Sequence, residues 1–181
     1  MQEIGIVRRI DELGRVVIPK EIRKTLRIRE GDPLEIYTNK EELVFRKYSP
    51  IATLSDSLKT VADALEEMLG KPCYITDTDS VLYSSGGKTR ACVGKKLSQE
   101  AQQTIIDRKS VIACKMKGTS PIKLCSCEEF NVENQIFVPI ISAGDCYGAV
   151  VVCDKDKNAC FTSYDEKLVQ MGAIFLAKHF E

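Results

Sequence analysis

The first twenty residues follow a pattern that is typical of extended chain. Isoleucine and other residue types alternate over residues 4–10, and this period of two predicts a strand. Residues 11–14 end in Gly14, which takes a positive φ at low cost and predicts a turn. The β-branched run at residues 15–18 predicts a second strand. The chain is therefore expected to begin with two strands joined by a turn.

A short helix and a hairpin are expected next. Pro19 suits the first turn of a helix, and the pattern continues that helix over residues 20–26. Two apolar runs at residues 34–37 and 43–47 flank a polar turn at residues 39–41, which predicts a β-hairpin.

The size of this first segment predicts self-association. It spans about fifty residues, and a unit below ~60 residues buries too little surface to be comfortably stable alone. Its short strands would also leave edges without hydrogen-bonding partners. A second copy of the chain removes both problems, so we expect a dimer formed through residues 1–50.

Helical periodicity begins after the boundary at Ser49 and Pro50. Apolar residues recur at spacings of three and four over residues 51–69, and Gly70 ends this predicted helix. The remaining pattern predicts strands at residues 73–76, 81–84, 135–141 and 147–153, a helix from the N-cap Ser98 to residue 108, and a last helix over residues 164–180 capped by Ser163.

These patterns predict two domains. We expect an N-terminal domain at residues 1–50, a linker and helix start at residues 51–55, and a C-terminal domain at residues 56–181. The order of elements in the second domain indicates an α+β fold, with an antiparallel sheet and helices on one or both faces.

Composition places the chain in the cytoplasm. Hydrophobic residues make up 44% and charged residues 29% of the sequence, which is ordinary globular composition. No apolar run approaches the roughly 20 residues that a membrane helix needs. The first twelve residues carry charge without an apolar core, so they do not resemble a secretory signal. We therefore expect a cytoplasmic protein that does not enter a membrane.

Charge is distributed unevenly although the net charge is zero. Residues 1–31 contain eight Lys and Arg against five Asp and Glu, which gives +3, whereas residues 32–181 contain 18 against 21, which gives −3. A basic N-terminal segment followed by a mildly acidic remainder is typical of a protein whose N-terminal segment binds the phosphates of nucleic acid. Chance is the competing interpretation of so small an excess.

Four basic residues of the predicted helix form a single stripe. Lys20, Arg23, Lys24 and Arg27 stand at i, i+3, i+4 and i+7. Arg15 follows the predicted turn, where it could be presented from a strand end, and arginine reads guanine edges and phosphates bidentately. Arg8 and Arg9 are neighbours and should point to opposite faces of a regular strand. The competing interpretation is a solvated helix face.

The run from Gly5 to Pro50 resembles the swapped-hairpin DNA-binding domain of the AbrB family of transition-state regulators. The shared pattern is a turn, Gly-Arg, an apolar strand, proline and a basic helix. The resemblance implies an intertwined, β-barrel-like dimer that binds double-stranded DNA and activates or represses transcription, here of sporulation genes. The residues that correspond to the DNA contacts of the family are Arg8, Arg15, Arg23 and Lys24, with Arg9, Lys20 and Arg27 as candidates for additional contacts.

Residues 138–152, with the sequence VPIISAGDCYGAVVV, resemble the hairpin of a GAF domain. This resemblance implies a regulatory or assembly domain, with an unidentified small ligand near the loops at residues 83–89 and 114–127. The helices at residues 51–69 and 164–180 are natural surfaces for association of dimers into a tetramer. Neither catalytic residues nor a resident cofactor are implied.

All eight cysteines lie between Cys73 and Cys160. In a cytoplasmic chain we expect reduced, partly buried thiols, and regulatory chemistry of an exposed thiol is the alternative. Cys125 and Cys127 with Cys114 fit the spacing of structural zinc poorly, so no metal is predicted. A thiol enzyme is a competing hypothesis, because some GAF domains reduce methionine sulfoxide with active-site cysteines.

Other candidate sites carry less weight. Residues 86–89 lack the spacing of a phosphate loop. Asp77 and Asp79 suit local hydrogen bonds in a turn, and His179 suits a helix end. A further alternative is an antitoxin, because heads of this type also occur in toxin–antitoxin pairs. The periodic apolar body argues against the disordered tail that an antitoxin would use.

Overall fold

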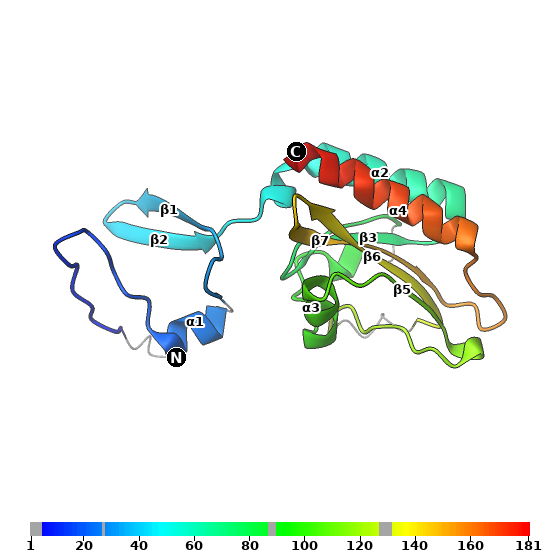
Figure 1. Ribbon diagram of the computed structural model, residues 1–181, viewed down its shortest axis with the longest axis horizontal. Coiled ribbons are helices and arrows are strands. Elements are labelled where there is room, and N and C mark those ends of the chain that lie inside the picture. The colour runs from blue at the N-terminus through cyan, green and yellow to red at the C-terminus, as the bar shows by residue number, and fades with distance from the viewer. Residues whose placement is uncertain (1–4, 27, 87–89, 127–131) are drawn as a thin grey trace. The chain divides into compact units, whose positions relative to one another are not determined.

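The computed structural model describes residues 5–26, 28–86, 90–126 and 132–181. It divides the chain into two compact units, Met1–Tyr48 and Ser49–Glu181, which are called the head and the body below. Figure 1 shows both units, and each is described here by itself. Among the described residues, no helix is long and apolar enough to cross a membrane.

The head contains one short helix and one hairpin. Helix α1 spans Lys20–Leu26, and strands β1 (Leu34–Asn39) and β2 (Glu42–Lys47) pair antiparallel. Asn39 pairs with Glu42 across a two-residue turn in which Lys40 has a φ of +53°. The helix and the hairpin confirm the prediction for this part of the chain.

The two strands predicted before α1 do not form within the single chain. Over residues 5–18, the backbone hydrogen bonds of the described chain close only the turn at Asp11–Arg15, and the rest follows an irregular extended path (Figure 1). Ile4, at the start of the predicted strand, lies outside the described residues. The physical reason is that a strand needs a neighbour for its N–H and C=O groups, and nearby segments of the same chain supply none here.

The head lacks a buried core of its own. Of its described residues only Pro19 is buried. Several large apolar side chains are exposed instead, the most extreme being Val7 at 90%. The others are Ile6, Ile10, Leu13, Val16, Val17, Leu26, Ile36, Leu43, Phe45 and Tyr48. Because stable isolated domains bury such side chains, the described head is not a complete folding unit by itself.

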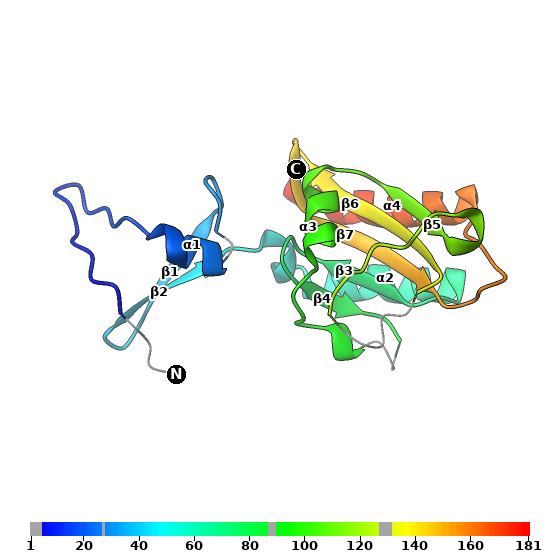
Figure 2. The same cartoon turned by 90° about the horizontal axis from the view of Figure 1, so that it is seen from below.

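The body is built on a five-stranded antiparallel sheet. Its strands are β3 (Cys73–Thr76), β4 (Val81–Ser84), β5 (Val111–Cys114), β6 (Asn134–Ser142) and β7 (Asp145–Asp154). The spatial order is β4-β3-β7-β6-β5, so the long β6–β7 hairpin forms the centre and edge strands lie on both sides (Figure 2). Strand β5 was not predicted, because a run of four residues beside a polar loop carries too little periodicity.

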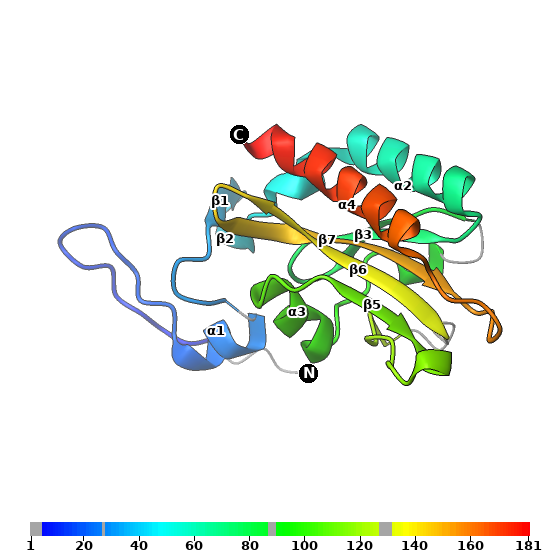
Figure 3. The ribbon, with the colours of Figure 1, turned by 45° about the vertical axis from the view of Figure 1, so that its right-hand side comes forward.

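Helices cover both faces of this sheet. Helices α2 (Ser55–Leu69) and α4 (Ser163–Ala177) pack on one face and against each other, and α3 (Gln99–Ile106) packs on the other face (Figure 3). Each interface holds its own apolar core, one around Ile136, Val150 and Leu176 and one around Phe137 and Val151. The α+β prediction is confirmed.

The helix ends refine the predictions from sequence. A 3-10 turn at Pro50–Thr53 precedes α2, which ends at Gly70 in the left-handed region as expected. Ser98 caps α3, and its hydroxyl accepts a hydrogen bond from the N–H of Ala101. The cap of α4 is Thr162 and not Ser163, because Thr162 and Asp165 form a reciprocal capping box.

Strand β7 of the central hairpin approaches the backbone of β3 closely at one glycine. Its turn is Ala143-Gly144, with φ values of +49° and +87°. Further along β7, Gly148 adopts a φ of +153°, and a Cβ atom there would lie 1.8 Å from the carbonyl oxygen of Thr76. Glycine therefore allows β3 to pair with β7 at this point.

Candidate nucleic-acid interface

Helix α1 presents three of the predicted DNA contacts. Lys20, Arg23 and Lys24 are all exposed, and no residue of the helix is buried. The helix begins after the buried Pro19, whose carbonyl oxygen accepts a hydrogen bond from the N–H of Arg23 at 3.0 Å. The predicted basic stripe is thus confirmed as exposed over these three positions, and Arg27 lies outside the described residues.

Arg15 is held by the turn that precedes α1. One carboxylate oxygen of Asp11 accepts hydrogen bonds from the N–H groups of Leu13 and Arg15 at 3.0 and 2.8 Å. The other oxygen accepts from Nε of Arg15 at 2.7 Å. The side chain of Arg15 is nonetheless 71% exposed. The turn therefore fixes the direction of the guanidinium while leaving it accessible.

The same contacts favour the ionised form of Asp11. The backbone N–H of Arg15 first, and then its guanidinium, lower the pKa of the carboxyl group below its ordinary value of 3.8. Sequence reasoning placed Asp11 in a turn but missed its contact with Arg15. The available signal was an aspartate at the first position of a turn, where its side chain accepts nearby N–H groups.

Arg8 and Arg9 are both exposed in the loop before the turn. Arg8 also borders an apolar groove of about 510 Å³ between this loop, α1 and β2. The groove is lined mainly by aliphatic side chains, among them Ile6, Val17, Ile22 and Leu26. The prediction that Arg8 and Arg9 point to opposite faces stays a prediction, since the regular strand on which it rests is absent from the single chain.

The predicted contacts come from two elements of one unit. The loop at residues 5–19 carries Arg8, Arg9 and Arg15, and α1 carries Lys20, Arg23 and Lys24. All six side chains are exposed. Cations on a loop and a helix of one small unit can neutralise phosphates and donate hydrogen bonds to base edges.

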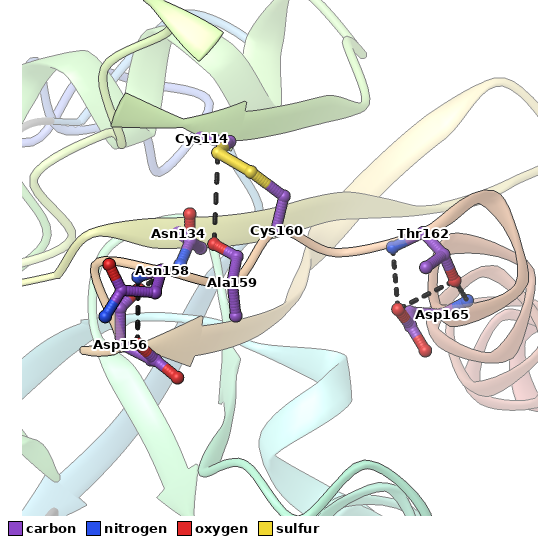
Figure 4. The surroundings of a disulfide bond; sticks show 8 residues. All are labelled: Cys114, Asn134, Asp156, Asn158, Ala159, Cys160, Thr162 and Asp165. Carbon is purple, nitrogen blue, oxygen red and sulfur yellow. Dashed lines mark hydrogen bonds between the residues drawn. A yellow bond between two sulfur atoms is a disulfide. The ribbon is translucent and has the colours of Figure 1, made fainter. Parts of the chain in front are cut away.

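The cysteines of the body correct one prediction. Cys114 and Cys160 are joined by a disulfide, with Cα atoms 5.7 Å apart, although they are separated by 46 positions in sequence (Figure 4). The prediction of uniformly reduced thiols was therefore wrong for this pair, because only the folded chain brings the two residues together. Among the described residues, no group of three metal-binding side chains is close enough to hold an ion, and Cys127 lies outside them.

The remaining polar candidates take part in local structure. Oδ1 of Asp77 accepts hydrogen bonds from the N–H groups of Asp79 and Ser80 at 2.7 and 2.6 Å, and His179 lies in the 3-10 turn that ends α4, as expected. Part of the loop predicted near the ligand, residues 87–89, lies outside the described residues. Among the described residues, a pocket of about 330 Å³ is lined by Lys59, Tyr83, Ser84 and Val93.

Two family models match the chain and meet at residue 53. Residues 7–53 match a model described as antidote-toxin recognition MazE, bacterial antitoxin. Residues 53–181 match a model described as stage V sporulation protein T C-terminal, transcription factor.

Two curated proteins of Bacillus subtilis (strain 168) are similar in sequence. The chain is 42% identical to stage V sporulation protein T over 182 residues, which cover 100% of this chain and 99% of that protein. It is 48% identical to the transition state regulatory protein AbrB over 71 residues, which cover 39% of this chain and 74% of that protein.

A solved structure shows the fold of the body. The GAF domain of a phosphoenolpyruvate-protein phosphotransferase from Acinetobacter matches with a TM-score of 0.58 and 18% identity, over 71% of this chain and 86% of that one. At this identity the likeness concerns the fold alone, and it agrees with the GAF-like hairpin expected from residues 138–152.

Proposed function

The chain belongs to the family of stage V sporulation protein T, and we propose that it binds DNA through Arg8, Arg15, Arg23 and Lys24. It is a DNA-binding transcriptional regulator of sporulation-related genes. The observation that carries the assignment of residues is the exposed basic side of α1 beside an arginine that a turn holds in place.

The chemistry of each residue suggests its role. Arg15 and Arg23 offer planar guanidinium groups, which bond guanine edges and phosphates in pairs. Lys24 offers a single point charge, which neutralises phosphate without that geometry. Arg9, Lys20 and Arg27 are proposed as additional DNA contacts. The head carries the charge for this task, since residues 1–31 have a net charge of +3.

A gel-shift titration with a DNA fragment that the protein binds tests these roles. Replacing Arg15 or Arg23 by alanine should lower the affinity by about 1–3 kcal/mol if the side chain reads a base. The fold should survive, because both side chains are exposed. A matched control is Lys123→Ala, which removes an exposed cation from the body. Wild-type affinity in both head variants would refute the assignment.

The second copy of the chain is the proposed partner of the head. Outside the turn at residues 11–15, the extended residues 5–18 show no backbone pairing among the described residues, and the groove beside α1 supplies an apolar surface of matching character. Exchange of these segments between two copies would give each strand a neighbour and bury the exposed aliphatic side chains. This arrangement is the intertwined dimer expected from the AbrB-like sequence.

Sedimentation of the isolated head tests this arrangement. Residues 1–50 should sediment as a folded dimer at micromolar concentration, because a single copy leaves its apolar side chains in water. Replacing the exposed Val17 by aspartate should weaken the dimer, since it would place a charge in the shared core. A folded monomer of the unchanged head would overturn the proposal.

For the body we propose assembly and signal input. Helix α4 exposes Met171, Ile174 and Phe175 on its outer side, and α2 exposes Met68, which suits association of dimers into a tetramer. An unidentified small ligand of the GAF-like domain would act on DNA binding through its differential affinity for one arrangement of the heads. A thiol enzyme is the competing role, and a turnover assay on methionine sulfoxide distinguishes the two.

An antitoxin function is favoured by one observation only. The model described as a bacterial antitoxin matches the head. The body argues against it, because residues 49–181 form a compact unit with two buried cores rather than a tail free to wrap a toxin.

A further inference from the structure

Two cysteines from distant parts of the body meet beside the start of α4. Cys114 ends the edge strand β5, and Cys160 lies in the loop that leads from β7 to α4. The disulfide between them is the only covalent link across this part of the body that the described residues show (Figure 4). The Cys114 sulfur also lies 4.0 Å from the carbonyl oxygen of Ala159, so the loop runs close along the strand end.

The two sulfur atoms differ in accessibility. Cys114 is buried, with only 4% of its surface exposed, whereas Cys160 is half-buried. Thiol–disulfide exchange proceeds by in-line attack on a sulfur that the attacking thiolate can reach. Cys160 is therefore the sulfur through which exchange can begin, and Cys114 is the sulfur that leaves or resolves.

Burial protects three other thiols of the body, those of Cys73, Cys146 and Cys153, from exchange. Cys73 and Cys153 are fully buried, and burial raises the pKa of both thiols far above the ordinary range. Burial also raises the pKa of Cys146, which is partly exposed in β7. Since the thiolate is the reactive form, these three residues stay protonated and unreactive at neutral pH.

We propose that Cys114 and Cys160 form a reversible oxidation site, which exchanges with low-molecular-weight thiols and disulfides by way of Cys160. In the oxidising direction, the Cys160 thiolate attacks a small disulfide RSSR and releases one RS⁻. The Cys114 thiolate then attacks the Cys160 sulfur and releases the second RS⁻. The protein loses two electrons and two protons, and RSSR becomes two RSH. Reduction follows the same steps backwards.

The bond changes how the loop before α4 is held. At its start, the carbonyl of Asp156 accepts a hydrogen bond from Nδ2 of Asn134 at 2.7 Å. At its end, the N–H of Thr162 donates to Oδ2 of Asp165 at 2.7 Å. The disulfide lies between these two anchors. Reduction leaves the loop attached at its ends and free to leave β5 in between, directly beside the first turn of the proposed assembly helix.

A titration of the full chain with mixtures of reduced and oxidised glutathione tests the site. After quenching and alkylation, peptide mass spectrometry should show the Cys114–Cys160 crosslink appear in one two-electron transition as the mixture becomes more oxidising. Hydrogen exchange over residues 155–162 should be faster in the reduced form. Absence of the crosslink at every ratio, its persistence in fully reduced glutathione, or equal exchange in both forms would each overturn the proposal.

Single variants test the order of the steps. Cys114→Ser should accumulate glutathione on Cys160, because the resolving thiolate is missing. In Cys160→Ser, the yield of glutathione on Cys114 should be at least about tenfold lower than the yield on Cys160 in Cys114→Ser, because the Cys114 sulfur is buried. Cys146→Ser is the matched control and should keep the transition of the unchanged chain. An equal yield of adduct on Cys114 would contradict the assignment of Cys160 as the entry sulfur.

Discussion

A single carboxylate organises the part of the head that carries Arg15. Asp11 accepts two backbone N–H groups and the Nε–H of Arg15, so it shapes the turn and orients the guanidinium at once. An ordered arginine loses less conformational freedom on binding DNA than a mobile one. If Arg15 contacts DNA as proposed, Asp11 is a positioning residue for that contact, although its own charge would repel phosphate.

The titration of Asp11 reports this arrangement. Because the pKa is lowered, the carboxylate stabilises the turn above pH 3.8, and that contribution is lost as the pH falls through the lower folded value. Carboxyl-detected NMR should give a midpoint below 3.8 for Asp11 in the unchanged protein. In Arg15→Ala the midpoint should rise toward 3.8, though not fully, since the backbone contacts remain. An identical midpoint in both proteins would contradict the contact.

Residue type and spacing were enough to find the basic side chains but not their partners. Lys20, Arg23 and Lys24 lie on one exposed helix because the i, i+3, i+4 rule depends only on local geometry. The contact between Asp11 and Arg15 depends on the direction of one side chain, and the Cys114–Cys160 bond depends on the tertiary fold. Neither is encoded in local periodicity.

Individual elements were predictable where the chain itself supplies their partners. Helices α2 and α4 and the β6–β7 hairpin formed as expected, because each is long and buries a clear apolar side. Strand β5 has only four residues, so its sequence shows too little periodicity to predict a strand. It is a strand because it pairs with β6. The missing strands of the head are the opposite case, in which a good strand pattern lacks a neighbour.

The N-terminus of α4 offers a direct test at the scale of one element. Thr162 accepts the N–H of Asp165 and completes a capping box, so Thr162→Ala should lower the free energy of unfolding by about 1 kcal/mol. Ser163→Ala, one position later in the first turn, should have little effect. Urea denaturation of the full chain in the oxidised form measures both. A larger loss for Ser163→Ala would place the cap where sequence alone had suggested it.

At the scale of the whole molecule, charge and chemistry are divided between the two units. The head holds the basic excess, whereas residues 51–181 carry 15 Lys and Arg against 17 Asp and Glu and contain every cysteine. A body with this balance is poorly suited to follow a phosphate backbone. We therefore expect the body to influence DNA binding through assembly and not through its own contacts.

The salt dependence of DNA binding measures this division. The slope of log K against log salt counts neutralised phosphates at about 0.9 per contact. The isolated head, at a concentration where it is dimeric, should show nearly the slope per dimer of the full chain. Fluorescence anisotropy at a series of salt concentrations gives both slopes. A much shallower slope for the head would mean that the body also contacts DNA phosphates.

The exposed apolar side of the head has a genetic consequence. If a second copy completes the core, a chain that keeps Val17 and its aliphatic neighbours but lacks Arg15 still pairs with normal chains. In a cell that makes the normal and the altered chain in equal amounts, only a minority of the dimers would then contain two normal chains. Loss of the proposed DNA contact in this chain would then be dominant, whereas loss of a pairing residue would be recessive, because such a chain could not form a dimer with the normal chain.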